Sequence, residues 1–321
     1  MFAALGIFWT QAFPPKPQWT VNDIPDLSGK VTIVTGGNSG VGYETCKALL
    51  SHDAKVYMAS RSKSKAEEAI AQLHRETGRS AIFLELDLGS LASVKQAAQT
   101  FLGLEPELHI LFNNGGIMTP PIEALTTDGY DLQHGTNVLG HYFFTTLLVP
   151  ALAAGARTSH DGKARIVVTA SSVADFCRSF DFAVMKGSGS DDAARRKMGT
   201  QGLYIQSKFA NIMLSKEFAR RFVDHGIVAN AVNPGNLQSN LQRHQSAFLR
   251  WIMNTTLLHP VRFGALTQLY VGTAPETAQA NGKYFIPWAR PGDAVQNPLA
   301  NDAQLSAKLW DWLEEQVQPF L

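Results

Sequence analysis

A glycine-rich turn near the N-terminus constrains the fold more than any other feature of this sequence. Val31–Thr35 is a run of apolar and β-branched residues, which predicts a strand that is buried on both faces. The turn Gly36–Gly42 follows at once, and Tyr43–Leu50 then has the pattern of a helix. In such a unit the backbone N–H groups face a pyrophosphate, which glycine allows the backbone to approach closely. The sequence therefore predicts a dinucleotide-binding α/β domain.

Strand and helix patterns alternate along the rest of the chain. Six further segments are typical of strands: Lys55–Ser60, Ala81–Leu86, His109–Asn113, Arg165–Thr169, Val228–Val232 and Tyr284–Ile286. The alternation predicts a doubly wound, Rossmann-type sheet of seven parallel strands flanked by helices. With 321 residues and 45% hydrophobic content, the chain can bury one large core, and no linker-like break divides it. We expect an N-terminal extension at 1–28 and a single domain at 29–321.

A tyrosine and a lysine lie four residues apart, at Tyr204 and Lys208, with Ser172 upstream. Residues at this spacing share one face of a helix, so the phenol and the ammonium can point into the same cavity. A nearby cation stabilises the phenolate, and lowering the tyrosine pKa from about 10 to ~7 needs roughly 4 kcal/mol. Such a tyrosine can protonate a carbonyl that is being reduced or deprotonate an alcohol that is being oxidised. Taken alone, the spacing is also common on solvated helices.

The order of these motifs resembles the short-chain dehydrogenase/reductase family in its single-domain form, from about Gly29 to Gly235. The resemblance is greatest to the retinol-dehydrogenase-like branch and to related fungal reductases. It implies a catalytic set of Asn137, Ser172, Tyr204 and Lys208. It also implies cofactor contacts from the glycine turn and from later segments: Gly36, Asn38, Ser39, Gly40, Val41, Gly42, Asp87, Leu88, Asn114, Gly115, Tyr204, Lys208, Pro234 and Gly235. Glycine replaces the alanine of the family's Asn-Asn-Ala-Gly segment, and we expect that turn to survive with more freedom.

The resemblance implies a role for each catalytic residue. The nicotinamide of the cofactor gives a hydride to a carbonyl carbon, and Tyr204 protonates the oxygen. Ser172 hydrogen-bonds the same oxygen; its neighbour Ser171 is the second candidate for this role, with packing at the strand end as the alternative. Lys208 lowers the pKa of Tyr204 and holds the nicotinamide ribose, and Asn137 positions a water that relays protons to Lys208.

The end of the second predicted strand indicates which cofactor is used. An NAD site has an acidic residue here, which binds the ribose 2′-hydroxyl. In this chain the place is taken by Ser60, which cannot repel a phosphate, and Arg61 follows. A guanidinium can pair with a 2′-phosphate through two hydrogen bonds. We therefore predict NADP(H), with help from Asn38 and Lys65; the alternative is that Arg61 is an exposed loop arginine.

Two segments with little pattern are expected to face the substrate. The first is a long insert at 176–202. The second, at 237–260, is rich in large apolar residues and resembles a lid over an apolar pocket, although a core-packing helix pair is an equal alternative. We expect substrate contacts from Ser172, Phe176, Trp251 and Trp288. This predicts a lipophilic aldehyde, ketone or alcohol as the substrate.

Composition argues against other kinds of partner. The formal net charge of +1 gives no electrostatic reason to expect nucleic-acid binding. The two cysteines, Cys46 and Cys177, form no disulfide framework and suggest a reducing compartment, so we expect a cytoplasmic location. The His, Cys and acidic residues do not have the spacing of metal ligands, so no metal is expected.

The N-terminus leaves two possibilities open. Phe2–Trp9 is apolar but much shorter than the ~20 residues that span a bilayer, and no basic segment precedes it. It either packs on the domain or lies at a membrane surface as an interfacial anchor. A homo-oligomer is also expected from the resemblance, because family members often associate through the helices that here carry Asn137 and Tyr204.

Three functions are compatible with these motifs. The first is an NADPH-dependent carbonyl reductase of apolar substrates, and the second is an alcohol or retinol-type dehydrogenase that works in the opposite direction. The third is an NADP-binding regulatory protein without turnover. The complete set of Asn137, Ser172, Tyr204 and Lys208 argues against the third, because a protein that has lost catalysis usually leaves one such residue free to change.

Overall fold

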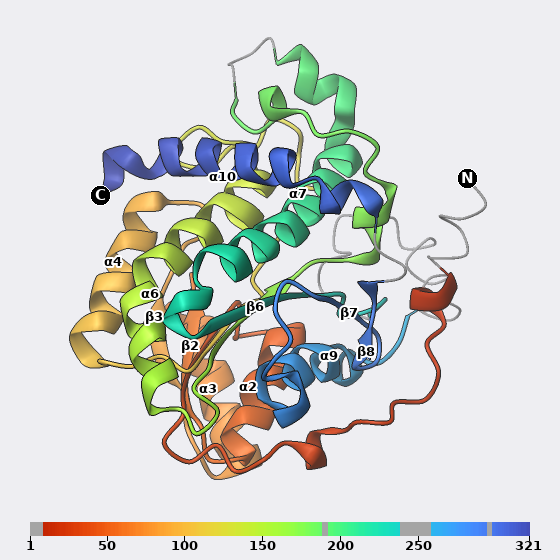
Figure 1. The fold of residues 1–321 in the computed structure, drawn as a ribbon. Coiled ribbons are helices and arrows are strands. Elements are labelled where there is room, and N and C mark those ends of the chain that lie inside the picture. Colours follow the sequence, from red (N-terminus) through yellow and green to blue (C-terminus); the bar gives the residue numbers. More distant parts are fainter. Residues whose placement is uncertain (1–8, 188–191, 238–257, 294–296) are drawn as a thin grey trace.

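The computed structural model describes residues 9–187, 192–237, 258–293 and 297–321, which form one sheet with helices on both faces (Figure 1). The strand order is β3-β2-β1-β4-β5-β6-β7-β8. Seven of the strands are parallel: β1 (Val31–Thr35), β2 (Lys55–Ser60), β3 (Ile82–Glu85), β4 (Ile110–Asn113), β5 (Ala164–Thr169), β6 (Ile227–Val232) and β7 (Tyr284–Ile286). The predicted doubly wound parallel sheet is therefore confirmed.

An eighth strand was not expected from the sequence. β8 (Arg290–Pro291) pairs antiparallel with β7 at one edge of the sheet. It is two residues long and contains proline, so it has neither the length nor the alternating pattern that predicts a strand. The sheet thus has eight strands rather than seven.

Two layers of helices cover the sheet. One face is covered by α4 (Leu91–Leu104), α6 (Gly140–Thr158) and α7 (Ala193–Arg221), and the other by α2 (Gly40–Ser51), α3 (Lys63–Thr77) and α9 (Val261–Thr273) (Figure 1). Neighbouring strand residues serve opposite layers, so Ile33 packs in the cluster with α4 and Val34 packs in the cluster with α2. Strands buried on both faces are consistent with their near-continuous apolar sequences.

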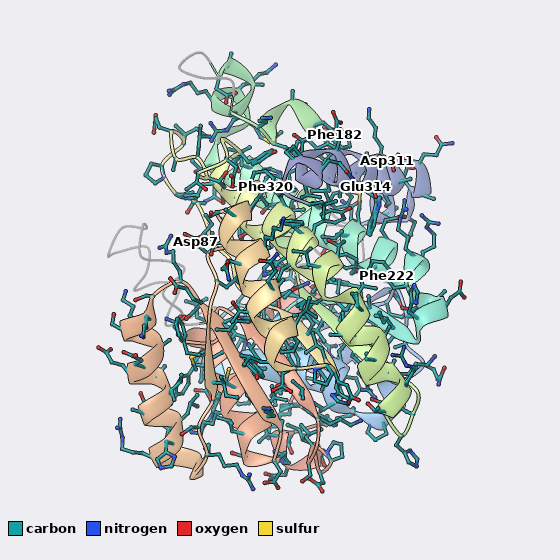
Figure 2. The ribbon with its side chains drawn as sticks, turned by 90° about the vertical axis from the view of Figure 1, so that its left-hand side faces the viewer. Asp87, Phe182, Phe222, Asp311, Glu314 and Phe320 are labelled. Carbon is teal, nitrogen blue, oxygen red and sulfur yellow. The ribbon has the colours of Figure 1, made fainter. Side chains whose placement is uncertain are left out.

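The C-terminal helix α10 (Ala303–Val317) packs on the outside of α7 (Figure 1). Leu309, Trp310 and Leu313 are buried on its inner side, whereas Asp311 and Glu314 are exposed (Figure 2). This spacing is that of an amphipathic helix, whose apolar stripe adds to the core beneath it.

A long apolar stretch precedes and includes α6. It consists of α5 (Leu132–His134), the π-helical turn η2 (Gly135–Leu139) and α6 itself. By length and hydropathy this stretch could span a membrane, but most of it is buried inside the domain, as expected of a core helix.

The N-terminal segment runs along the layer that contains α2. Trp19, Ile24 and Leu27 are buried in the same cluster as the residues of α2 and α9. Its first described residues form a helical turn at 9–12, which lies beside β7 and β8 (Figure 1). The turn is therefore close to the carboxyl ends of the strands, where α/β sheets bind their ligands.

Candidate functional site

The glycine turn after β1 has positions that favour glycine, some because of close packing and some because of the backbone angle. Gly36 and Gly40 have positive φ angles of 65° and 56°. A Cβ atom on Gly36 would lie 2.9 Å from the Gly115 Cα, and one on Gly42 would overlap the Gly36 carbonyl oxygen. Ser39 caps the start of α2 without a side-chain bond to the helix. The turn therefore offers exposed backbone and a helix N-terminus, which fit the pyrophosphate of a dinucleotide.

Thr35 joins this turn to the one after β4. Its hydroxyl oxygen accepts hydrogen bonds from the backbone N–H groups of Asn114 (3.0 Å) and Gly115 (2.9 Å). The Asn114 side chain donates in turn to the Thr35 carbonyl oxygen at 2.9 Å. The turn after β4 is thus formed as expected, although Gly115 replaces the alanine of the family's segment. A methyl group there would lie 3.0 Å from the Leu88 side chain, which already occupies most of the space.

His141 extends this connection to the helix that carries Asn137. The His141 Nδ1 lies 3.1 Å from the Asn137 carbonyl oxygen, which can only accept, so Nδ1 carries the proton. Nε2 is then free to accept a hydrogen bond from the Thr35 hydroxyl at 2.8 Å. Burial lowers the pKa of His141 to about 4, so the ring stays neutral. Nothing in the sequence marks this role, because the contacts join segments far apart in the chain.

Asn137 lies in the π-helical turn η2, and its side chain is held on three sides. Its Oδ1 accepts from the Ile117 N–H at 2.9 Å, and its Nδ2 donates to the Ile117 carbonyl and the Ser207 hydroxyl, each at 3.1 Å. Ser207 precedes Lys208 on α7, so Asn137 ties the loop after β4 to the helix that carries the tyrosine and the lysine. Single π-helical turns within α-helices, such as η2, often occur at functional sites.

Tyr204 and Lys208 share one buried face of α7, as predicted. The Lys208 Nζ lies 6.0 Å from the centre of the Tyr204 ring and donates to the Thr169 carbonyl at the end of β5, at 2.9 Å. α7 contains a kink at Gly199, where φ is 71°, so the part that carries both residues starts after the kink. The structure thus brings both side chains to the carboxyl end of β5.

The structure pairs Tyr204 with Ser171 rather than with the predicted Ser172, because the side chain of Ser171 makes the hydrogen bond with the tyrosine. Ser171 has an extended backbone and caps the short 3-10 helix η3 (Ser172–Phe176), so its hydroxyl projects ahead of the helix. Ser172 is already the first residue of η3 and is only 3% exposed. Ser171, the second of the two candidates from the sequence, is therefore the serine that faces the tyrosine.

The pKa of Tyr204 also differs from the expectation. Burial raises it to about 12, although the hydrogen bond with Ser171 acts in the opposite direction. Burial likewise lowers the pKa of Lys208 to about 8. For the chain by itself, the desolvation of the phenol sets the direction of the shift, and Lys208 is not among the groups that move the tyrosine pKa. Both groups keep their protons at neutral pH.

The residues at the adenosine side flank the glycine turn. The Gly36 N–H donates to the Ala59 carbonyl at 2.8 Å, which places Ser60 and the exposed Arg61 beside the turn. The Ser60 hydroxyl is buried and has no hydrogen-bond partner in the described part of the chain. Asp87, labelled in Figure 2, follows β3, and its Oδ1 accepts from the Gly89 N–H at 2.9 Å. An unpartnered hydroxyl beside a guanidinium fits a ribose that carries a phosphate.

The loop after β6 carries Pro234 and Gly235. The Gly235 N–H donates to the Asn233 Oδ1 at 2.9 Å, and the φ angle of Gly235 is 89°. A Cβ atom there would lie 3.0 Å from the Trp288 ring. Trp288 is buried against this loop and against His259, so it lines the core behind the loop rather than an open substrate surface.

Other predicted substrate contacts have different outcomes. Phe176 ends η3 and is half-buried, four residues after Ser172. Trp251 and most of the segment at 237–260 lie outside the described residues.

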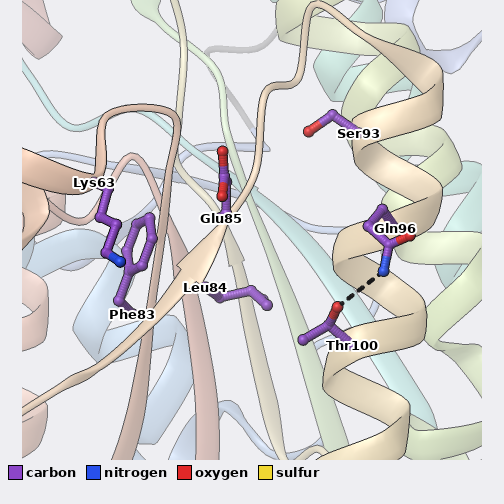
Figure 3. Close-up of a pocket in the computed structure, with 7 residues that line it drawn as sticks. All are labelled: Lys63, Phe83, Leu84, Glu85, Ser93, Gln96 and Thr100. Atoms are coloured by element: carbon purple, nitrogen blue, oxygen red, sulfur yellow. Dashed lines mark hydrogen bonds between the residues drawn. The ribbon is translucent and has the colours of Figure 1, made fainter.

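A cavity of about 560 Å³ is found elsewhere, at the outer edge strand β3, between α3 and α4 (Figure 3). Its lining residues come from none of the elements that carry Asn137, Ser171, Tyr204 and Lys208, so the cavity lies apart from these residues.

Comparisons with known proteins agree with this geometry. Residues 30–184 match the family model of the short chain dehydrogenases. The chain is 50% identical over 319 residues to a short-chain dehydrogenase/reductase of Armillaria gallica, with 98% of this chain and 100% of that protein covered. A solved structure of an uncharacterized protein of Mycobacterium paratuberculosis is 28% identical and has a TM-score of 0.72, with 94% of this chain and 97% of that chain covered. A short-chain dehydrogenase of Shigella flexneri, complexed with NADP, has a TM-score of 0.62 over 81% of this chain and 98% of that chain; at 21% identity it shows the fold alone.

Proposed function

The chain belongs to the short-chain dehydrogenase/reductase family of oxidoreductases, and from this premise we propose that it is an NADP(H)-dependent carbonyl reductase of lipophilic small molecules. The observation that carries the proposal is the protonated Tyr204 phenol, buried against Ser171 and on the same helix face as Lys208. A phenol with a pKa of about 12 holds its proton at neutral pH, so it acts as a proton donor. In this state Tyr204 can supply the proton that reduction of a carbonyl requires, which is the direction we propose.

The bound cofactor would supply the hydride, and the residues of the chain would control the oxygen of the substrate. Tyr204 gives its proton to the oxygen as negative charge develops there. Ser171 donates a hydrogen bond to the same oxygen, in the role that the resemblance assigned to Ser172. Lys208, which keeps its charge at neutral pH, stabilises the phenolate that is left. Asn137 holds the loop after β4 against α7, so that these groups stay in register.

The test of this function is a series of straight-chain aldehydes and ketones of increasing length, assayed by the loss of NADPH absorbance. We expect kcat/KM to rise with chain length, because each added methylene that is buried contributes about 0.8 kcal/mol. Turnover of alcohols with NADP⁺, but of no carbonyl with NADPH, would instead support the dehydrogenase alternative. Binding of NADPH without turnover in either direction would support the regulatory protein.

Arg61 is the residue with which we propose that the chain selects NADP(H). Replacement of Arg61 by alanine should weaken NADPH binding by about 10- to 100-fold, since a charge-assisted hydrogen bond contributes about 1.5–3 kcal/mol. The affinity for NADH should change little, because NADH lacks the 2′-phosphate. Dissociation constants can be measured by the fluorescence of the reduced cofactors. Arg75→Ala, at an exposed arginine in the last turn of α3, is the matched control. An unchanged ratio of the two affinities in Arg61→Ala would reject this assignment.

The remaining expectations stay predictions of the sequence. They are a cytoplasmic location, a peripheral membrane contact through the N-terminus, and assembly as a homo-oligomer. The described part of the N-terminal segment packs on the domain through Gln11 and Ala12, while Trp9 and Phe13 are exposed.

A further inference from the structure

We propose that Gln11, in the N-terminal extension, is a positioning residue that joins two loops of the reaction site. One loop carries Ser171 and the other carries Pro234 and Gly235. The matched family segment begins at residue 30, so this contact comes from outside it. The inference rests on the proposed function, which gives these two loops their roles toward substrate and cofactor.

The side chain of Gln11 is almost completely buried, with 1% exposure, and its amide makes three hydrogen bonds. Its Nε2 donates to the Asp175 Oδ2 at 2.9 Å. Its Oε1 accepts from the Asn233 Nδ2 at 2.8 Å and from the Tyr284 hydroxyl at 3.2 Å. A carboxylate can only accept, so the Gln11 amide has one possible orientation. Burying an amide is unfavourable unless it is paired, and here both its nitrogen and its oxygen are used.

The contact with Asp175 acts on the loop that carries Ser171. Asp175 lies in η3, which begins directly after Ser171. The second carboxylate oxygen of Asp175 accepts from the Asn297 N–H at 3.0 Å. Asp175 is therefore held from two sides, and through η3 it sets where the Ser171 hydroxyl projects.

The contact with Asn233 acts on the loop after β6. The Asn233 Nδ2 donates to Gln11, which turns its Oδ1 toward the Gly235 N–H. Without Gln11 the Asn233 amide could flip and present its NH₂ group to Gly235, where two donors would face each other. The orientation of one buried amide thus determines whether the Pro234–Gly235 turn keeps its hydrogen bond.

The backbone around Gln11 is also bound to the domain. The Thr10 carbonyl accepts from the Arg290 guanidinium at 3.1 Å, and the Ala12 carbonyl lies 3.3 Å from the His259 Nε2. These contacts hold the turn at 9–12 against the edge formed by β7 and β8 (Figure 1). The extension therefore approaches both loops as an ordered element.

Three variants test the proposal. Gln11→Met keeps the volume but removes all three hydrogen bonds. Gln11→Glu keeps the two acceptor contacts but places a carboxylate against Asp175. Asp175→Asn leaves one oxygen in that side chain, which the Gln11 and Asn297 donors would both need. We expect each to lower kcat for carbonyl reduction and to weaken NADPH binding by about 10-fold, because each removes or opposes hydrogen bonds that contribute about 1 kcal/mol apiece.

The double variant Gln11→Glu with Asp175→Asn should restore the wild-type values to within about threefold. In it the new amide at position 175 donates to the new carboxylate at position 11, and its oxygen still accepts from Asn297. All contacts therefore return, and donor and acceptor are exchanged only between positions 11 and 175. A role limited to folding would lower the melting temperature but leave kcat and the NADPH dissociation constant unchanged in the folded protein. Gln18→Met, at an exposed glutamine of the same extension, is the control.

The proposal is overturned if Gln11→Met keeps the wild-type kcat and NADPH affinity, or if the double variant is no better than Gln11→Glu. Its failure can be told apart from failure of the proposed function. If the wild-type protein reduces no carbonyl, the NADPH dissociation constants of the four variants still decide whether Gln11 positions the Pro234–Gly235 loop.

Discussion

Replacing Tyr204 by phenylalanine is expected to lower kcat for carbonyl reduction by a factor of about 10²–10⁴, the usual contribution of a positioned proton donor. The ring fills the same space in α7, so only the hydroxyl that contacts Ser171 is lost. NADPH affinity should change far less than kcat, because the glycine turn and the Thr35 contacts are untouched. Steady-state kinetics on the best carbonyl and cofactor titration separate the two effects.

Tyr130→Phe is the matched control for this experiment. Tyr130 is also buried, but its hydroxyl donates to Gln316, at 3.2 Å, away from the catalytic set. We expect it to lose some stability and to keep its turnover. If Tyr204→Phe turned over as fast as Tyr130→Phe, Tyr204 would not be the proton donor.

Replacing Arg195 by methionine should lower the free energy of unfolding by about 3–5 kcal/mol, because it leaves buried carboxylates without their cation. Arg195 bonds Asp131 at 2.8 Å and Asp192 at 3.2 Å, and all three side chains are at most 6% exposed. Burial alone would raise the pKa of Asp131, but hydrogen bonds from His134 and Arg195 outweigh it and hold that pKa below its usual value. The Asp131 carboxylate is thus charged in the folded protein and depends on these partners.

Arg196 provides a control one residue away. It pairs with Glu123 at 3.2 Å, but the two side chains are 53% and 64% exposed. Arg196→Met should therefore change stability by less than about 1 kcal/mol. Urea unfolding of both variants measures the difference. Equal effects of the two substitutions would show that the Arg195 ion pairs do not stabilise the start of α7.

The strands could be predicted from the sequence because their burial on both faces requires continuous apolar runs. β5 and β6 are examples, each fully buried along its length. β8 could not be predicted, because only its pairing with β7 makes it a strand. The same holds for the kink at Gly199, where a positive φ interrupts a segment that otherwise has a helical sequence.

The catalytic residues were predictable only as far as their spacing on one helix could fix them. Tyr204 and Lys208 lie on one face because of the helix geometry. Which of the adjacent serines, Ser171 or Ser172, faces Tyr204 depends on the path of the chain after β5, which the sequence does not determine. In the structure it is Ser171. The direction of the Tyr204 pKa shift depends on how deeply the phenol is buried, which cannot be read from the sequence. The sequence shows only that a cation, Lys208, lies four residues away.

Contacts between distant segments could not be predicted either, because the local sequence does not show which distant residues meet. The amide of Gln11 meets Asn233, 222 residues further along the chain, and nothing in the local sequence marks either residue. His141 and Trp288 also have roles that depend on contacts between distant segments. The first connects Thr35 to Asn137, and the second packs behind Gly235.

The short strand β8 has a consequence for how copies of this protein can associate. Pro291 has no backbone N–H, and β8 is only two residues long, so this edge offers almost no pattern of donors and acceptors to an incoming strand. We therefore do not expect a continuous sheet shared between two molecules on that side. Helical surfaces and the opposite edge at β3 are therefore the surfaces on which we expect any assembly of copies to form.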